Sequence, residues 1–159
     1  MNDSTAKFSL YQTIDTIGAY DFEYFTIADK HYLAVANFES EKGQWNLESV
    51  IYQWNGQQFD VLQNISTNGA TSFKFFKAAK DEEELFLAVT NYRDGDKSVI
   101  YKWSGRQFEK FQEIETEGAQ ESTAFVIDDD IYIAFANFQN SQRGIFCSLN
   151  CFQAVRKKL

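Results

Sequence analysis

The sequence contains an internal repeat, and this repeat limits what the chain can fold into. The pattern Phe-x-x-x-Gln-x-Ile-x-Thr-x-Gly-Ala occurs three times, at residues 8–19, 59–70 and 108–119. The glycines of successive copies are 51 and 49 residues apart. A period of about 50 residues is typical of arrays in which one supersecondary unit buries its apolar face against the next copy.

Two further motifs follow the first at matching places in each unit. Leu-Ala-Val-Ala-Asn at residues 33–37 returns in altered form at residues 87–91 and 133–137. Ser-Val-Ile-Tyr-x-Trp-x-Gly occurs at residues 49–56 and 98–105. Because three motifs recur in the same order, the repeat extends through whole units and is not a single duplicated segment.

Each unit is predicted to form four short antiparallel strands. In the first unit these strands cover residues 20–27, 31–38, 49–54 and 59–65, and we call their positions a, b, c and d. The segments are too short for ordinary helices and are rich in β-branched and aromatic residues. The Asn-Gly pair at residues 55–56 is typical of a two-residue hairpin turn between c and d.

We therefore predict an all-β fold of three tandem four-stranded antiparallel β-propeller-type blades. The chain is interpreted as one domain over residues 1–159, with units at about 8–58, 59–107 and 108–155, the last of them degenerate. Propellers close with about four to eight blades, so three blades make a partial propeller. Large and small apolar residues alternate over residues 33–36, which predicts a strand packed between two sheets.

The two ends of the array depart from this pattern. Residues 8–14 precede the first complete unit and are predicted to form a strand of the d type. In the third unit Ile145 and Phe146 are interpreted as the isoleucine and tyrosine of the c motif, and Ser148 as the residue at its tryptophan position. Phe152 is then interpreted as a remnant of the strand d phenylalanine, in a capping or truncated unit.

An end blade without a neighbour leaves an apolar sheet face in water. Exposing about 500 Å² costs about 12 kcal/mol at roughly 25 cal/mol per Å². This is comparable with the net stability of a whole domain. We therefore expect the chain to self-associate through its exposed blade faces.

Composition excludes several partners and places. The net charge of −8 disfavours nucleic acid and anionic membrane surfaces, which need a concentrated basic face. No apolar run reaches the roughly 18 residues of a membrane-spanning helix, and no membrane insertion is expected. The first residues hold no apolar segment, so no secretory signal is predicted here.

Cys147 and Cys151 would lie about 13 Å apart on one strand, which favours free thiols and leaves the compartment open.

The quoted motifs resemble the epitempin repeat, also called the EPTP or EAR repeat, over residues 8–138. The family includes the leucine-rich glioma-inactivated proteins and the thrombospondin-type-laminin EAR-repeat proteins. The resemblance implies a seven-bladed extracellular propeller that binds other proteins, often receptors at the cell surface. An extracellular location rests on this resemblance alone, and the residues themselves leave the cytoplasm open.

The residues do not assemble a recognisable catalytic site, and no cofactor is predicted. His31, the only histidine, is expected at the turn between strands a and b. Together with Cys147 and Cys151, both in the degenerate third unit, it gives only three possible zinc ligands, and no zinc site is predicted. Asp21 and Glu23 alternate on strand a and share one face. They are interpreted mainly as hydrated channel residues, and they are a weak candidate calcium site.

The sequence thus predicts a non-enzymatic binding module. Trp45, an aromatic residue of the longest loop with no counterpart in the other units, is the candidate contact for a protein partner. Protein–protein interaction, with an extracellular or cell-surface partner, is the leading hypothesis. Carbohydrate binding and a self-assembling structural role are the alternatives.

Overall fold

The structure is a computed structural model that describes residues 7–78, 84–93, 97–141 and 144–153. For residues 139–141 and 144–147 it describes the backbone only. All described regular elements are β-strands, in eleven segments. The all-β fold class predicted from the repeat is confirmed.

The strands form three separate antiparallel sheets, which we call blades 1, 2 and 3. Blade 1 contains β1 (Ala19–Ile27), β2 (Lys30–Asn37), β3 (Asn46–Trp54) and β4 (Phe59–Asn68), paired in that order. Blade 2 contains β5 (Ala70–Lys77), β6 (Leu85–Asn91), β7 (Ser98–Trp103) and β8 (Phe108–Ile114). Blade 3 contains β9 (Ala119–Ile127), β10 (Asp130–Ser141) and β11 (Gly144–Gln153). Blade 3 therefore has three strands in the described part of the chain.

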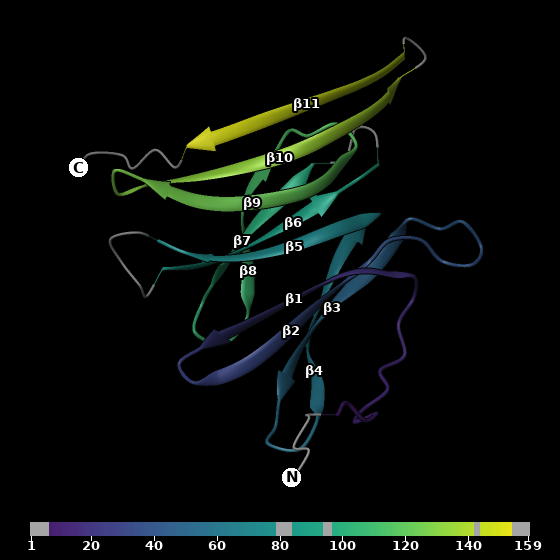
Figure 1. The fold of residues 1–159 in the computed structure, drawn as a ribbon, viewed down its shortest axis with the longest axis vertical. Coiled ribbons are helices and arrows are strands. Elements are labelled where there is room, and N and C mark those ends of the chain that lie inside the picture. The colour runs from purple at the N-terminus through teal and green to yellow at the C-terminus, as the bar shows by residue number, and fades with distance from the viewer. Residues whose placement is uncertain (1–6, 79–83, 94–96, 142–143, 154–159) are drawn as a thin grey trace, which may run out of the picture.

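The blades stack face to face along the chain, and Figure 1 shows them in the order 1, 2, 3. The a strands are neighbours across the stack, because β5 lies against both β1 and β9. The d strands β4 and β8 are at the opposite side of their blades. This is the arrangement expected for propeller blades whose innermost strands surround an axis.

The core lies between the blades and depends on the alternation of large and small residues in strand b. Ala34 and Ala36 are fully buried and share one cluster with Phe73 and Leu87 of blade 2. Ala88 of blade 2 is also fully buried and shares a second cluster with Phe135 of blade 3. The small residues thus leave room for the large side chains of the next blade, as predicted.

The motif glycine, which precedes strand a, lies beside the residue that follows the motif asparagine at the end of strand b in each blade. The backbone N–H of the residue after the asparagine donates to the glycine carbonyl in all three units, at 2.9 Å. Gly118 has φ of +59°, and a Cβ there would lie 2.2 Å from the Phe138 carbonyl oxygen. Only glycine fits, because both the left-handed backbone and the close approach exclude a side chain.

The motif glutamine links neighbouring blades through its carboxamide. Gln63 Nε2 donates to the Phe108 carbonyl oxygen at 2.8 Å, and the Phe108 N–H donates back to Gln63 Oε1 at 2.8 Å. Gln12 makes the same pair with Phe59, at 3.1 and 3.0 Å. We call this contact the glutamine clamp. It holds the first residue of one d strand to the d segment before it.

The turns follow the sequence with small shifts. The turn between β1 and β2 consists of Ala28 and Asp29, both with positive φ, as a type I′ hairpin requires. His31 is therefore the second residue of β2, opposite Thr26, and not a turn residue as predicted. The turn between β3 and β4 covers residues 55–58, so its centre lies one residue later than predicted.

The register of β11 corrects the alignment of the third unit. Phe152 pairs with Ile133 as Tyr52 pairs with Leu33, so Phe152 takes the tyrosine position of strand c and not the phenylalanine position of strand d. Ser148 pairs with Asn137, well before the tryptophan position. The prediction failed because the c motif has lost its sequence pattern, while the pairing keeps a constant offset of 100 residues from blade 1.

The predicted d-type strand at residues 8–14 is absent, because the structure assigns no strand between residues 7 and 18. A d strand needs a c strand beside it, and no described strand pairs with this segment. It is held to blade 1 by side chains instead, through the Gln12 clamp and a bond from the Tyr11 hydroxyl to the Gln57 carbonyl oxygen. The motif alone does not produce the strand.

The glutamine clamp predicts a measurable loss of stability. Gln63→Ala leaves the N–H and carbonyl of the buried Phe108 without partners, and we expect the free energy of unfolding to fall by about 1–3 kcal/mol. Urea unfolding followed by tryptophan fluorescence measures it. Gln107→Ala is the matched control, since only the backbone of Gln107 is bonded. Equal effects for the two variants would contradict the clamp.

Candidate functional site

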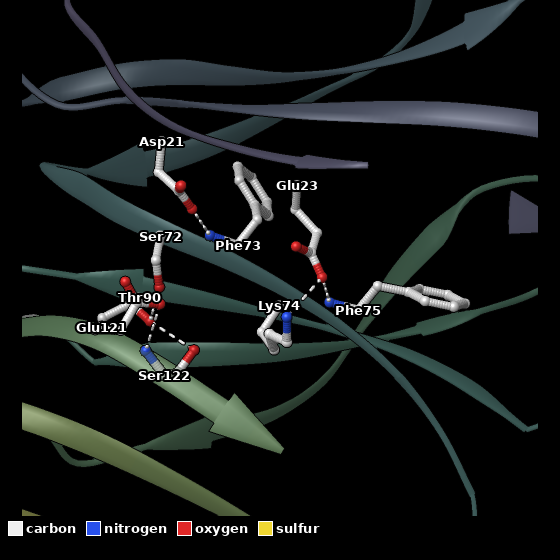
Figure 2. Close-up of polar contacts among 9 residues, drawn as sticks. All are labelled: Asp21, Glu23, Ser72, Phe73, Lys74, Phe75, Thr90, Glu121 and Ser122. Atoms are coloured by element: carbon white, nitrogen blue, oxygen red, sulfur yellow. Dashed lines mark hydrogen bonds and ion pairs between the residues drawn. The ribbon is translucent and has the colours of Figure 1, made fainter. Parts of the chain in front are cut away.

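The acidic pair of β1 faces the neighbouring blade. Asp21 Oδ2 accepts a hydrogen bond from the Phe73 N–H at 3.1 Å, and Glu23 Oε1 accepts one from the Phe75 N–H at 2.9 Å. Lys74 Nζ lies 3.2 Å from the same Glu23 oxygen. Figure 2 shows both carboxylates directed at the backbone of β5. They satisfy donors on the edge of β5 that its own sheet leaves free.

This geometry gives Asp21 and Glu23 backbone partners that their interpretation as hydrated channel residues did not include. Their oxygens bind blade 2, because an a strand has a sheet neighbour on one side only and its other edge needs acceptors. Among the described residues, no three histidine, cysteine or acidic side chains come together in a way that would hold a metal ion. Calcium binding by this pair stays a prediction.

The corresponding junction between blades 2 and 3 uses hydroxyl groups. Ser72 Oγ donates to Thr90 Oγ1 at 2.9 Å, which donates to Ser122 Oγ at 3.1 Å, and all three residues are buried (Figure 2). Ser72 stands where Asp21 stands in blade 1, and its short side chain does not replace the acid. Glu121 Oε1 accepts from the Ser122 N–H at 3.2 Å instead. The two junctions therefore share a geometry but not a chemistry.

Trp45 lies at the junction of blades 1 and 2. Its ring centroid is 4.7 Å from that of Phe38 and 5.9 Å from that of Tyr92. The Arg93 guanidinium carbon lies 5.1 Å from the same ring centroid, in a cation–π contact. The side chain is half-buried, and its backbone oxygen accepts from the Gly69 N–H at 2.8 Å. Trp45 therefore fixes its loop onto blade 2.

In the part of the chain that the structure describes, the titratable groups do not converge on one centre. His31 Nδ1 lies 2.7 Å from the Tyr24 hydroxyl on an exposed surface, with no acid or nucleophile in the described contacts of its ring. Burial raises the pKa of Tyr101, and the Glu113 carboxylate adds to the rise. Hydrogen bonds from Lys110 and Lys97 lower the pKa of Glu113. These shifts belong to packing and surface ion pairs.

The two cysteines lie on one strand, as the predicted spacing requires. Cys147 pairs with Phe138 and Cys151 with Ala134, four residues apart on β11. Cys151 is a free, exposed thiol. The side chain of Cys147 lies outside the described part of the structure. Among the described residues no helix is long and apolar enough to cross a membrane.

Sequence reasoning missed the residues that join the blades. Asn91 Oδ1 accepts from the Asn68 N–H at 3.1 Å, and Asn137 Oδ1 accepts from the Glu117 N–H at 3.3 Å. The glutamine clamp is a second contact of this kind. The signal was available, because the asparagine and the glutamine are present in every copy of the motifs while most of their neighbours vary.

The fold and these junctions define a tandem array of propeller-type blades whose repeated polar residues serve assembly. A model of the EPTP domain matches the chain three times, at residues 7–55, 58–104 and 107–148. These matches cover most of the sequence. The chain belongs to the EPTP repeat family, as the motifs indicated.

Two similar proteins carry the same repeat. The human thrombospondin-type laminin G domain and EAR repeat-containing protein is 45% identical over 93 residues. Its mouse counterpart is 42% identical over 93 residues. Each alignment covers 57% of this chain and 13% of the relative, so the chain matches a small part of the length of these proteins.

The position of the acidic pair predicts a stabilising role. In Asp21→Ala the Phe73 N–H loses its acceptor, and we expect the free energy of unfolding to fall by about 1–2 kcal/mol in urea titrations. Asp15→Ala removes an exposed carboxylate from the segment that precedes β1 and serves as the control. If Asp21→Ala leaves the free energy of unfolding unchanged, water replaces the carboxylate at no cost and the prediction is wrong.

The Trp45 contact predicts a difference between two glycine substitutions. A Cβ at Gly69 would lie 2.8 Å from the Trp45 ring, whereas one at Gly105 meets nothing within 4 Å, and both residues have positive φ. Gly105→Ala should cost about 1 kcal/mol for the backbone alone. Gly69→Ala should cost clearly more, because the indole must move. Thermal unfolding measures both, and equal losses would contradict the contact.

Proposed function

We propose that this chain is a non-enzymatic protein-binding module for an extracellular or cell-surface partner. Membership of the EPTP family supports this proposal, as do relatives whose names combine EAR repeats with a thrombospondin-type laminin G domain. The observation that carries it is the connection between strands b and c. It differs in every blade, while the strands themselves repeat.

The b–c connections make one rim of the stack irregular. In blade 1 residues 38–45 separate β2 from β3, and in blade 2 residues 92–97 separate β6 from β7. In blade 3 the two strands extend until only residues 142–143 separate them. Loops that vary on a constant scaffold are where binding specificity is usually located. We call residues 38–45 the rim loop.

The rim loop forms one wall of an open hollow of about 840 Å³. Residues 16–19 also line the hollow, and Leu47 and Phe38 give it an apolar part. Glu39, Glu41 and Lys42 line it from the loop and leave the loop with one net negative charge. Together with the net charge of −8, they favour a partner that presents basic and apolar groups. Trp45 acts here as a positioning residue, because its ring holds the loop on blade 2.

Binding assays with extracellular domains test the proposal. Glu41→Lys reverses an exposed charge at the hollow, and we expect the dissociation constant of a captured partner to rise about tenfold. Glu109→Lys makes the same change on β8, away from the rim loop, and should leave binding unchanged. Surface plasmon resonance compares the two variants. Equal affinities would remove the rim loop from the interface.

Carbohydrate binding is the alternative function, and a second measurement distinguishes it from protein binding. A glycan array with the labelled chain should show no saturable binding if the partner is a protein. Saturable binding of one sugar class, together with failure to capture any protein from cell-surface extracts, would overturn the proposal. Both experiments use the folded chain, and the circular dichroism spectrum of a β protein verifies this first.

A further inference from the structure

The third motif glutamine has no clamp. Gln112 occupies in β8 the position of Gln63 in β4, but its carboxamide is exposed and without a hydrogen-bond partner among the described residues. Beside it lies an open apolar cavity between blades 2 and 3, lined by Phe86, Ile100, Phe111, Phe152 and others. At the previous junction, Phe108 is clamped and 2% exposed. The cavity is therefore at the place where the next d-strand phenylalanine belongs.

Blade 3 also has no d strand beside β11 in the described residues. A segment with the d motif is present at the other end of the array, at residues 8–17, but it forms no strand. Its Phe8 is fully exposed, whereas the counterparts Phe59 and Phe108 are both clamped. Within the described residues, the outer edge of β11 and the d segment at residues 8–17 therefore both lack a strand partner.

A buried acceptor without a hydrogen-bond partner, Asn37 Oδ1, shows that the conformation of residues 8–17 differs from that of the other two copies of the motif. The side-chain oxygens of Asn91 and Asn137 accept from the residue just before the motif glycine. The equivalent donor for Asn37 is the Ile17 N–H, yet Asn37 Oδ1 is buried without a partner. Ordering residues 8–17 as a d strand would place this donor as in the other two blades.

The two outer faces of the array are complementary copies of its inner junction. Between blades 1 and 2, Phe25 stacks on Phe75 with ring centroids 4.5 Å apart. The counterpart of Phe25 on blade 3 is Phe125, and the counterpart of Phe75 on blade 1 is Tyr24. Phe125 is 37% exposed and Tyr24 is 58% exposed, against 4% for Phe25. Each end face thus exposes the aromatic ring that would be the stacking partner of the ring on the other end face.

We propose that two copies of the chain assemble head to tail by exchanging these segments. Residues 8–17 of each copy form the fourth strand of the other copy's blade 3, alongside β11, and Gln112 clamps the backbone of the incoming Phe8. Tyr24 then stacks on Phe125 across the junction. The three blades described in each copy together make six, within the four to eight that close a propeller. Two-fold closure gives each of the described blade faces a neighbouring blade.

Sedimentation velocity of the full chain tests the assembly. At about 100 μM we expect a dimer of twice the chain mass of 18.4 kDa, which dissociates to monomer on dilution. Phe8→Ala and Gln112→Ala should each raise the dimer dissociation constant at least about tenfold. Both residues are exposed in the single chain, so neither variant should alter the urea midpoint of the monomer.

Leu10→Ala is the matched control in the exchanged segment. Leu10 corresponds to Val61 and Lys110, which stay exposed in complete blades, so this variant should dimerise normally. A single monomer at about 100 μM, species larger than a dimer, or a dimer that Phe8→Ala leaves unchanged would each overturn the proposal.

A peptide distinguishes the segment from other ways of filling the cavity. A labelled peptide of residues 7–18 should bind the Phe8→Ala chain, and Gln112→Ala in the same chain should abolish binding. Leu159, which follows Phe108 by 51 residues and lies outside the described residues, is the competing occupant. If it fills the cavity, the peptide will not bind and the inference fails. None of these measurements depends on the partner proposed above.

Discussion

The packing of one sheet face against the next is the interaction on which the structure depends. No blade has a core of its own, since Phe73 and Leu87 of blade 2 are buried against Ala34 and Ala36 of blade 1. Burying one phenylalanine contributes about 1.5–3 kcal/mol, so a junction of several such residues contributes far more than any single polar contact. The consequence appears at the end of the array, where Ala136, the counterpart of the buried Ala36, is exposed.

The polar motif residues fix the position of one blade relative to the next, which the apolar packing alone does not do. A flat apolar face permits sliding, whereas the clamp from Gln63 to Phe108 joins specific backbone atoms of two blades. The asparagine contacts do the same at the other end of each d strand. The motif residues that identify the family are therefore the ones that join neighbouring blades. Binding specificity belongs to what the repeats do not share, above all the rim loop and the free end faces.

The candidate site was harder to predict than the fold. Strand positions follow from alternation within the chain, and most predicted strands lie within a few residues of the observed ones. The role of Asp21 and Glu23 follows from the edge of β5, which lies 52 residues further along the chain. Trp45 was recognised as unusual, but its contacts with Tyr92 and Arg93 come from a second blade. No local pattern carries that information.

The sequence by itself determined that three like units of β-strands follow one another, because hydrophobic alternation and the motif glycines act within each unit. The tertiary structure alone decided the register of β11 and the absence of a strand at residues 8–14. Both depend on a partner strand, and a strand exists only where another backbone accepts and donates its hydrogen bonds. Residues 8–17 carry the d motif in full, yet without a c strand beside them they remain outside every sheet.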